Sequence, residues 1–384
     1  MNEGRVEELR IKIPEGFTTL RFYMYSFLNL VEAEKHEIGQ YIVIRSKDLL
    51  RALIDGFRIV REIVERQRND QTLSRLKLDT LPMSGNDRKV FMKLCYELGC
   101  ELDLVQIFGA YSDILGSKSI DNLRKGLEKF DIVAEGYSLP SIFKLELYGL
   151  TRTTLFKDGF SIDPRVSPDF LLLMLAGYIL SRVGRARIDE RNWISVHVFP
   201  TELAWSKSCW QRLHEELSGL WRGVRPTDAL TLFLLAKLWN LLKDEPHNLL
   251  ILGVADPSGR KPAAIDMSIN APLKDIYIRA KDKLNLLFEQ EWKKDIFIRL
   301  IEKALDARQQ NREIAEKFVK LLFLSLQGDT RALEELLLLS SRLEVAISQI
   351  RQKEPPGREI LSIAKDARII AKDLLMLISQ NHFP

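Results

Sequence analysis

The 384-residue chain has few of the residues that build metal centres and disulfide frameworks. It contains 3 cysteines (Cys95, Cys100 and Cys209) and 5 scattered histidines, and neither a CxxC nor an HExxH pattern occurs. A small, odd number of cysteines in so long a chain favours a reducing compartment over a disulfide framework. Because metal ligands must cluster, we expect no metal site and no cofactor, in a protein of the cytoplasm.

Long apolar runs are also missing. The longest uncharged apolar run, residues 170–180, is well short of the roughly 18–20 residues that a membrane helix needs. The first residues, MNEGRVEELRIKIPEG, are charged from the start, so we expect no secretory signal. The sequence therefore predicts no membrane association.

Motifs for nucleotide hydrolysis and nucleophilic catalysis are lacking too. A phosphate-binding loop needs GxxxxGK[ST] leading into a helix, but the nearest match, SGRK at residues 258–261, is followed by Pro262 and an expected strand. Residues 136–140 (GYSLP) lack the second glycine of a nucleophile elbow. We therefore expect no catalytic residues and no enzyme. An active site assembled from distant acids and histidines stays open as an alternative.

The composition is that of an ordinary globular protein. Hydrophobic residues make up 46% of the chain and charged residues 29%, which is enough for a sizeable core. The 57 basic and 53 acidic residues leave a net charge of +4, which alone says little about nucleic acid. The distribution of the positive charge along the chain must therefore indicate whether the partner is a nucleic acid.

The first 272 residues mix strand and helix patterns. Ser167, Pro168 and Asp169 predict the start of a deeply buried helix that runs to Leu180. Residues 20–30 fit a strand or a buried helix, and residues 68–86 are expected to be a loop. Strands are expected at 9–13, 41–44, 130–156 and 193–199 and in a hairpin at 249–269. Further helices are expected at 46–67 with Ser46 as N-cap, 87–98 ending at Gly99, 102–115, 119–129, 201–219 and 227–243.

After Pro272 the strand pattern disappears, and helices are expected at 281–308, 311–327, 330–352 and 358–380. Apolar residues spaced alternately by three and four positions in the last two helices suit side-by-side packing. The sequence therefore predicts an α+β protein. A mixed α/β domain would span residues 1–272, and a C-terminal four-helix-type bundle residues 273–384.

Three stretches concentrate basic residues: an expected loop at 181–191 (SRVGRARIDER), residues 221–226 (WRGVRP), and the tip of the 249–269 hairpin. The planar fork of arginine suits phosphate, and a basic hairpin tip has the shape to enter a DNA groove. The first domain is therefore the candidate nucleic-acid-binding domain. The candidate nucleic-acid-binding residues are Arg182, Arg185, Arg187, Arg191, Arg222, Arg225, Ser258, Gly259, Arg260 and Lys261.

Plainer interpretations compete with this one. The basic stretches could be solvated loops, or their arginines could pair with Asp189 and Glu190. The helical seams after Pro272 could dock a partner helix, although internal packing is the usual role of such seams. Aromatic rings could stack on bases, although core packing is the more usual place for the four tryptophans Trp193, Trp205, Trp210 and Trp221.

Three features carry a family resemblance: the buried helix with its basic tail, SPDFLLLMLAGYILSRVGRARI; the hairpin LLILGVADPSGRKPAAIDMSI; and the all-helical end from Leu273. In this layout the chain resembles the large subunit of archaeal type I-A (Apern subtype) CRISPR Cascade complexes. The resemblance implies a non-enzymatic role in antiviral defence. That subunit lies at the 5′ end of the crRNA, inspects the protospacer-adjacent motif (PAM), helps to open the duplex and helps to recruit the helicase-nuclease.

The resemblance also implies partners and residue roles. The implied partners are the crRNA, target double-stranded DNA, the backbone, handle-binding and small Cascade subunits, and the helicase-nuclease. PAM inspection would fall to Ser258, Gly259, Arg260 and Lys261, since in guide-directed systems protein reads the short motif. Backbone and handle contacts would fall to Arg185, Arg187, Arg191, Arg222 and Arg225. The alternative is a helical docking or scaffold protein that binds no nucleic acid.

Overall fold

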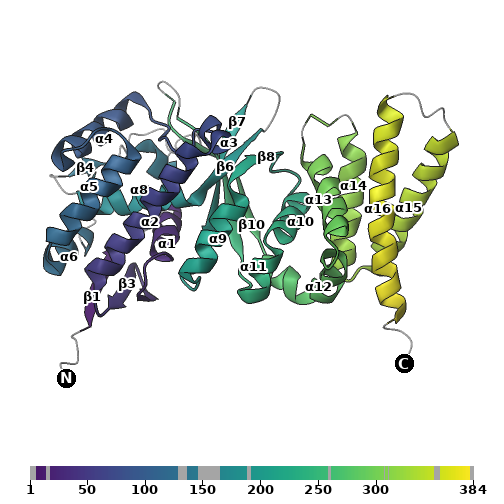
Figure 1. Ribbon diagram of the computed structural model, residues 1–384, viewed down its shortest axis with the longest axis horizontal. Helices are drawn as coiled ribbons and strands as arrows, with labels where there is room; N and C mark the ends of the chain where they lie inside the picture. Colours follow the sequence, from purple (N-terminus) through teal and green to yellow (C-terminus); the bar gives the residue numbers. More distant parts are fainter. Residues whose placement is uncertain are drawn as a thin grey trace, which may run out of the picture. The chain divides into compact units, whose positions relative to one another are not determined.

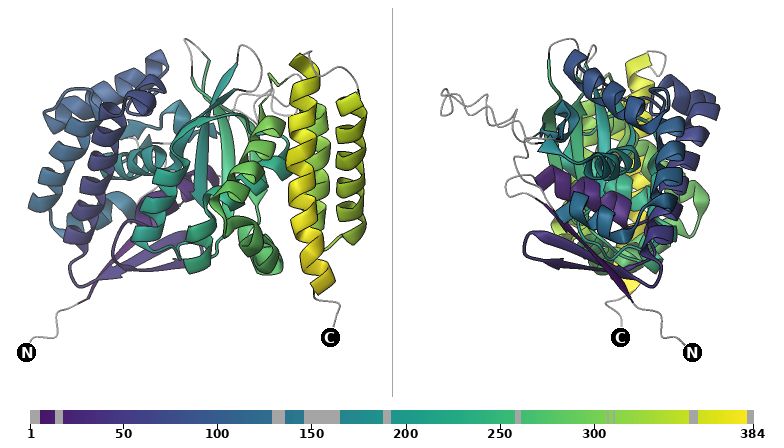
Figure 2. Two further views of the ribbon diagram at one scale, coloured as in Figure 1. Left: turned by 45° about the vertical axis from the view of Figure 1, so that its right-hand side comes forward. Right: turned by 90° about the vertical axis from the view of Figure 1, so that its left-hand side faces the viewer.

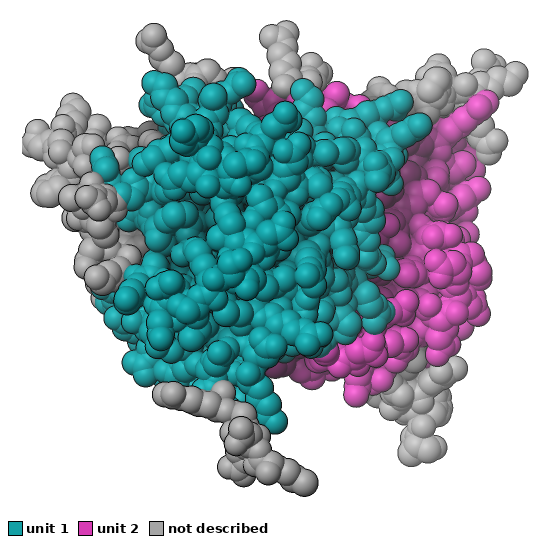
Figure 3. Space-filling model, turned by 60° about the vertical axis from the view of Figure 1, so that its left-hand side comes forward, with its two compact units in different colours: residues 1–185, 194–220, 249–268 teal, residues 186–193, 221–248, 269–384 magenta. Residues whose placement is uncertain are grey.

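The computed structural model describes residues 6–13, 18–128, 136–145, 165–187, 192–257, 261–306, 308–309, 311–349 and 355–380. The protein has the predicted α+β fold. Its contacts define two compact units, coloured in Figure 3: unit 1 (residues 1–185, 194–220 and 249–268) and unit 2 (residues 186–193, 221–248 and 269–384). The sequence analysis placed a boundary near residue 272 between two domains that would fold on their own, and this boundary stays a prediction.

Unit 1 opens with a small antiparallel sheet. Its strands β1 (Glu7–Lys12), β2 (Glu34–Ile38) and β3 (Tyr41–Ser46) lie in the order β1-β3-β2, which confirms the strands expected at 9–13 and 41–44. Leu9 and Ile11 are buried opposite Ile44 and Ile42. The aromatic segment at 20–30 is a helix, α1 (Thr18–Leu28), which packs on helix α8 (Pro168–Ser181; Figure 1). Burial on most of its surface explains why its sequence lacks a clear helical period.

The helices that follow are α2 (Leu49–Asn69), α3 (Gln71–Arg75), α4 (Gly85–Leu98), α5 (Leu104–Ser117) and α6 (Ile120–Glu128). The predicted N-cap Ser46 is wrong, because Asp48 accepts the backbone N–H of Arg51 and caps α2. Helix α3 lies in the segment expected to be a loop, where Asp70 caps it. Gly99 ends α4 as predicted, with a left-handed φ of 67°.

Helix α8 (Pro168–Ser181) begins as predicted, with the hydroxyl of Ser167 accepting the N–H of Phe170. It is buried all round. Between α6 and α8 lie the short strands β4 (Tyr137–Ser138) and β5 (Arg165–Val166) and the 3₁₀ turn η1 (Ser141–Phe143). The strand expected at 130–156 is therefore wrong over residues 139–145, and residues 129–135 and 146–164 lie outside the described residues.

A five-stranded sheet has the order β10-β9-β7-β6-β8. Its strands are β6 (Arg182–Arg187), β7 (Trp193–Pro200), β8 (Gly219–Trp221), β9 (Leu249–Ala255) and β10 (Ala264–Ala271), and α9 (Lys207–Leu217) lies between β7 and β8 in sequence. The expected strand at 193–199 and the two hairpin strands are confirmed. The basic stretch at 181–191 was expected to be a loop. Residues 188–191 lie outside the described residues, and the described part is not a loop. It is strand β6, whose inner position between β7 and β8 buries Val183 and Ala186.

In unit 2 the helix expected at 227–243 is two helices, α10 (Thr227–Lys237) and α11 (Trp239–Asp244). The break at Leu238 seats the ring of Trp239 against Tyr277 and Phe288, with ring centroids 5.3 and 5.2 Å apart. The remaining helices are α12 (Leu273–Phe288), α13 (Glu291–Leu305), α14 (Arg312–Leu326), α15 (Thr330–Gln349) and α16 (Pro355–Gln380). The single helix expected at 281–308 is therefore two, α12 and α13.

Helix α16 runs beside α15 and also packs on α13 (Figure 2). Within the described residues three ion pairs join α13 to α16. Arg299 donates to both oxygens of Asp366 at 2.6 and 2.9 Å, and Lys293 lies 2.8 Å from Asp373. The third pair is Lys303 with Asp366 at 3.7 Å. The bidentate pair on the buried Asp366 specifies how these two helices align.

We expect Gly177→Ala to lower the free energy of unfolding by about 3 kcal/mol or more. A Cβ atom at Gly177 in α8 would lie 1.9 Å from the backbone carbonyl oxygen of Tyr23 in α1, so the two helices would have to separate. Gly116→Ala in α5 is the matched control, because nothing lies within 4 Å of its added Cβ. The control should stabilise by up to about 1 kcal/mol in urea titrations. Equal effects of the two changes would contradict the close α1–α8 contact.

We expect stability to fall as the pH drops from 7 to 5. Burial lowers the pKa of His197 well below its ordinary value and that of His214 to about 3, with charge from Arg182 and Arg66 adding to each effect. The unfolded chain then binds more protons than the folded chain below pH 6.5, which costs about 2 kcal/mol per histidine by pH 5. Urea midpoints of wild type and His214→Gln at both pH values test this. The variant should show the shallower dependence, and parallel curves would contradict it.

Candidate nucleic-acid interface

Arg182, one of the predicted binding residues, is a structural residue of unit 1. Its side chain is 2% exposed and donates to Ser195 Oγ at 3.2 Å and to the carbonyl oxygens of Lys77 and Thr80 at 3.1 and 2.8 Å. Asp256 lies 3.7 Å away as its counter-charge. A buried guanidinium held this way is not available to a phosphate, so Arg182 is left out of the surface described below.

Arg185, three residues along β6, lies beside Asp256, where β9 leads into the tip of the β9–β10 hairpin. Its Nη2 is 3.4 Å from Asp256 Oδ2, while Ser195 donates its hydroxyl to the other oxygen of Asp256 at 2.6 Å. The structure thus brings Arg185 to the hairpin that the sequence analysis selected. Lys261 on the returning arm is exposed, whereas the rest of the predicted tip, Ser258, Gly259 and Arg260, lies outside the described residues.

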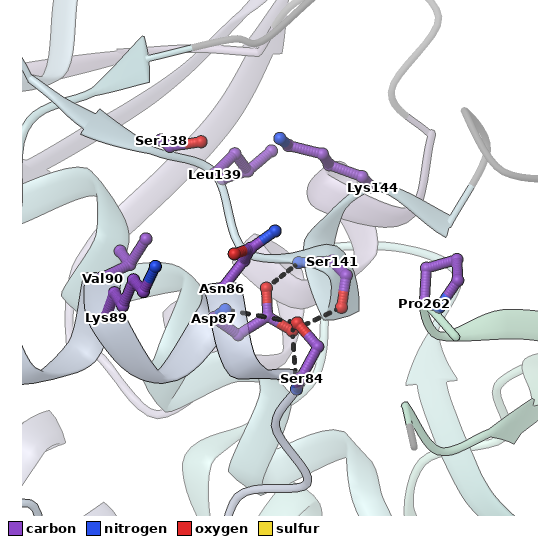
Figure 4. A pocket seen from close by; sticks show the side chains of 10 residues that line it. All are labelled: Ser84, Asn86, Asp87, Lys89, Val90, Ser138, Leu139, Ser141, Lys144 and Pro262. Atoms are coloured by element: carbon purple, nitrogen blue, oxygen red, sulfur yellow. Dashed lines mark hydrogen bonds between the residues drawn. The ribbon is translucent and has the colours of Figure 1, made fainter. Parts of the chain in front are cut away.

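A polar pocket of about 520 Å³ lies beside this returning arm (Figure 4). Three parts of unit 1 line it: the start of α4, the segment from β4 through η1, and Pro262 next to Lys261. Its two cations, Lys89 and Lys144, come from different elements. The lining residues are Ser84, Asn86, Asp87, Lys89, Val90, Ser138, Leu139, Ser141, Lys144 and Pro262.

The buried carboxylate of Asp87 holds two walls of this pocket together. It accepts the N–H and the hydroxyl of Ser141 at 2.7 and 2.6 Å and those of Ser84 at 3.1 and 2.7 Å (Figure 4). Ser84 in turn accepts the N–H of Asp87 in a capping box. Because both oxygens are engaged, the charge of Asp87 is directed into the wall, and the two lysines supply the pocket's positive charge.

In unit 2 the predicted residues Arg222 and Arg225 flank a close backbone contact. A Cβ atom on Gly223 would lie 2.1 Å from the carbonyl oxygen of Leu305 at the end of α13, so only glycine fits there. Arg312, at the start of α14, donates to the backbone carbonyl oxygen of Arg225 at 2.9 Å. The stretch WRGVRP is thereby placed against the α13–α14 connection.

Four arginines gather at this place, and we call them the arginine cluster: Arg222, Arg225, Arg308 and Arg312. The carboxylate of Asp306 lies among them. Burial opposes its ionisation, but hydrogen bonds from the side chain and backbone N–H of Arg308, with the charge of Arg222, lower its pKa below the usual value. Arg312 pairs with Glu316 at 2.6 Å. The cluster thus combines four guanidinium groups with the carboxylates of Asp306 and Glu316, and its residues Arg222 and Arg225 are exposed.

Arg187 lies at the end of β6, where its guanidinium stacks over the ring of Trp193 with 4.6 Å between group and centroid. Arg191 lies outside the described residues. Trp205, Trp210 and Trp221 are buried, so their expected place in the core is confirmed.

In unit 1 a histidine and a serine hydroxyl lie within hydrogen-bond distance of each other, and both are buried. Nδ1 of His197 lies 2.9 Å from Ser181 Oγ, but both side chains are fully buried among aromatic rings. Within the described parts of the chain, no group of three acidic, histidine or cysteine side chains is placed to hold a metal ion. No helix in those parts is long and apolar enough to cross a membrane.

Sequence analysis missed four residues of these surfaces: Lys89, Lys144, Arg308 and Arg312. The two arginines follow α13 near Asp306, about 85 residues after WRGVRP, and no local pattern links them. Lys144 lay in a segment that was interpreted as a strand. A cluster signal for Lys89 does exist in the sequence, because α4 carries Arg88, Lys89 and Lys93 within two turns.

We expect Asp256→Ala to lower the free energy of unfolding by about 3 kcal/mol, because it removes the counter-charge of the buried Arg182. Asp121→Ala is the control, since Asp121 pairs with Arg124 at 2.7 Å but is 71% exposed, and it should cost at most about 1 kcal/mol. Urea unfolding of both variants decides the point. Similar small losses would refute the structural role of Arg182.

Comparison with protein families places most of the chain in one family model. A family model described as "CRISPR-associated protein, CsaX" matches residues 44–344, which is more than half of the chain. No curated protein and no solved structure matches the chain.

Proposed function

The chain belongs to the CsaX family of CRISPR-associated proteins, and we propose that it is a nucleic-acid-binding large subunit of a type I-A surveillance complex. The expected place in CRISPR defence is thereby confirmed at the level of the family. The finer role is our proposal. In it the protein is a non-enzymatic, cytoplasmic subunit that contacts the crRNA 5′ end and target DNA.

The arginine cluster carries this proposal. Segments far apart in sequence converge so that two exposed arginines, Arg222 and Arg225, lie beside two arginines that are themselves engaged with Asp306 and Glu316. The planar fork of each exposed arginine can donate two hydrogen bonds to a phosphate, and the neighbouring guanidinium groups of Arg308 and Arg312 add positive charge. Such a surface suits the sugar-phosphate backbone and does not read sequence.

The hairpin is proposed to take the sequence-reading part. Arg185 and Asp256 form an ion pair where β9 leads into the tip, and Lys261 is exposed on the returning arm. The tip residues Ser258, Gly259 and Arg260 would inspect the PAM, and Arg187 and Arg191 would join the backbone contacts. In this division of labour, base pairing with the guide reads the target and the protein reads only the short motif. Other Cascade subunits and the helicase-nuclease are the proposed protein partners.

A second candidate function is a helical docking protein. The long helices α15 and α16 expose apolar side chains, with Leu338 50%, Val345 56% and Met376 55% exposed. A partner helix could cover them. This candidate predicts association that is insensitive to salt and to arginine substitutions.

We expect Arg222→Glu/Arg225→Glu to weaken binding of labelled duplex DNA, single-stranded DNA and RNA alike by tenfold or more, measured by fluorescence anisotropy over a salt series. Loss of two phosphate contacts should reduce the slope of log affinity against log salt by about 2. Lys320→Glu/Arg331→Glu, at two exposed cations of α14 and α15, changes the net charge equally and is the control.

Two results would contradict the proposal. One is a wild-type protein that binds none of the three probes even at low salt. The other is a double variant that binds them as the wild type does. In either case the docking role would be favoured, and co-purification partners of α15 and α16 variants would be the next measurement.

A further inference from the structure

The outer face of α4 combines positive charge with exposed rings and sulfur. Arg88, Met92 and Tyr96 follow one another at four-residue spacing, so they form one stripe, and Lys89 and Lys93 form the next. Tyr96 is 88% exposed and Met92 is 54% exposed. Among the large hydrophobic side chains that the structure describes, Tyr96 is the most exposed. It lies on a face with three cations and one acid, Glu97, which pairs with Lys93 at 4.0 Å.

This face is continuous with the pocket at the start of α4. Lys89 belongs to both, since it lines the pocket and lies one turn before Lys93 on the helix. Across the pocket, Lys144 supplies a second cation, and the exposed Asn86 supplies an amide with both donors and an acceptor. Within the residues that the structure describes, neither Arg88 nor Lys89 has a carboxylate at salt-bridge distance.

The walls of the pocket are held in place before any ligand arrives. Asp87 joins Ser84 at the start of α4 to Ser141 in η1, and Lys93 packs over the ring of Tyr137 at 4.8 Å, which ties α4 to β4. A preformed, concave, polar site loses little conformational entropy on binding. Its volume of about 520 Å³ lies in the usual range for pockets that bind small molecules.

These features together select one chemistry. Cations alone would serve any polyanion, but an exposed tyrosine and a pocket add nothing to binding of a duplex, whose bases are stacked inside. A single strand offers both a phosphate for the lysines and a free base face for the ring. Lys89 and Tyr96 are seven residues apart on α4, or about 10 Å along the axis, which equals roughly three base-stacking steps.

We infer that the pocket and the outer face of α4 form a binding site for single-stranded nucleic acid. A phosphate lies between Lys89 and Lys144, a base or sugar enters the pocket beside Pro262, and a neighbouring base stacks on Tyr96. The inference rests on the proposed nucleic-acid-binding function and adds to it a site, distinct in its residues from the arginine cluster, that prefers single strands.

The test uses the full-length chain and three fluorescein-labelled probes of about 15 nucleotides: oligo-dT, oligo-U and a duplex. Lys89→Glu/Lys144→Glu removes the pocket's charge, and Tyr96→Ala removes the stacking ring. Lys47→Glu/Lys320→Glu is the charge-matched control, because both lysines are exposed and neither lines the pocket or belongs to α4. All of these positions except Lys144 are exposed, and near-ultraviolet circular dichroism checks that each variant is folded.

We expect the pocket variant to bind single strands at least tenfold more weakly, while duplex binding changes no more than in the control. Tyr96→Ala should weaken single-strand binding by about tenfold, and Tyr96→Phe, which keeps the ring, should bind as the wild type does. A loss confined to oligo-dT or to oligo-U would support the site and identify DNA or RNA as its strand.

The failures of the two proposals can be told apart. If single-strand binding survives the α4 and pocket variants but is lost in Arg222→Glu/Arg225→Glu, the α4 site is refuted and the proposed function stands. If the control loses as much binding as the pocket variant, general charge explains the effect and the α4 site is refuted. If the wild type binds no probe, both proposals fail.

Discussion

One buried guanidinium joins the parts of unit 1 on which its basic surface depends. Arg182 lies where α8 passes into β6 and donates to β7 through Ser195, to the segment before α4 through two carbonyl oxygens, and towards Asp256 before the hairpin tip. A buried charge must satisfy its donors or destabilise the fold. The requirement therefore ties β6 and β7 to the segment before α4 and to Asp256 at the start of the hairpin tip. The pocket is lined by the start of α4 and by Pro262 beyond that tip.

Both basic surfaces are organised around a carboxylate. In unit 1 Asp87 takes four hydrogen bonds from two serines and so fixes the backbone that carries Lys89 and Lys144. In unit 2 Asp306 accepts hydrogen bonds from the guanidinium of Arg308, and the charge of Arg222 helps to lower its pKa. An acid inside a basic surface lowers the net positive charge, but it also orients the neighbouring donor groups. Orientation matters more for the planar guanidinium of arginine than for the ammonium of lysine, which acts as a point charge.

Local patterns predicted most elements where the signal is local. Ser167 and Pro168 begin α8 because capping involves only neighbours in sequence, and Gly99 ends α4 for the same reason. The secondary-structure predictions were wrong where a contact between residues far apart in sequence determines the local structure. The alternation around Ile142 resembles a strand, yet hydrogen bonds from Ser141 to Asp87, 54 residues away, impose a turn. Likewise SRVGRAR resembles a solvated loop until β7 pairs with it.

The sequence by itself determined the α+β class, the buried helix, the hairpin strands and the basic character of three stretches, because periodicity, capping and composition are properties of neighbouring residues. Tertiary structure alone decided which basic residues are available to a partner. It buried Arg182, joined Arg222 and Arg225 to Arg308 and Arg312, and gathered Lys89 and Lys144 around one pocket. The same residue type serves the core or the surface according to the burial and the counter-charge that segments distant in sequence supply.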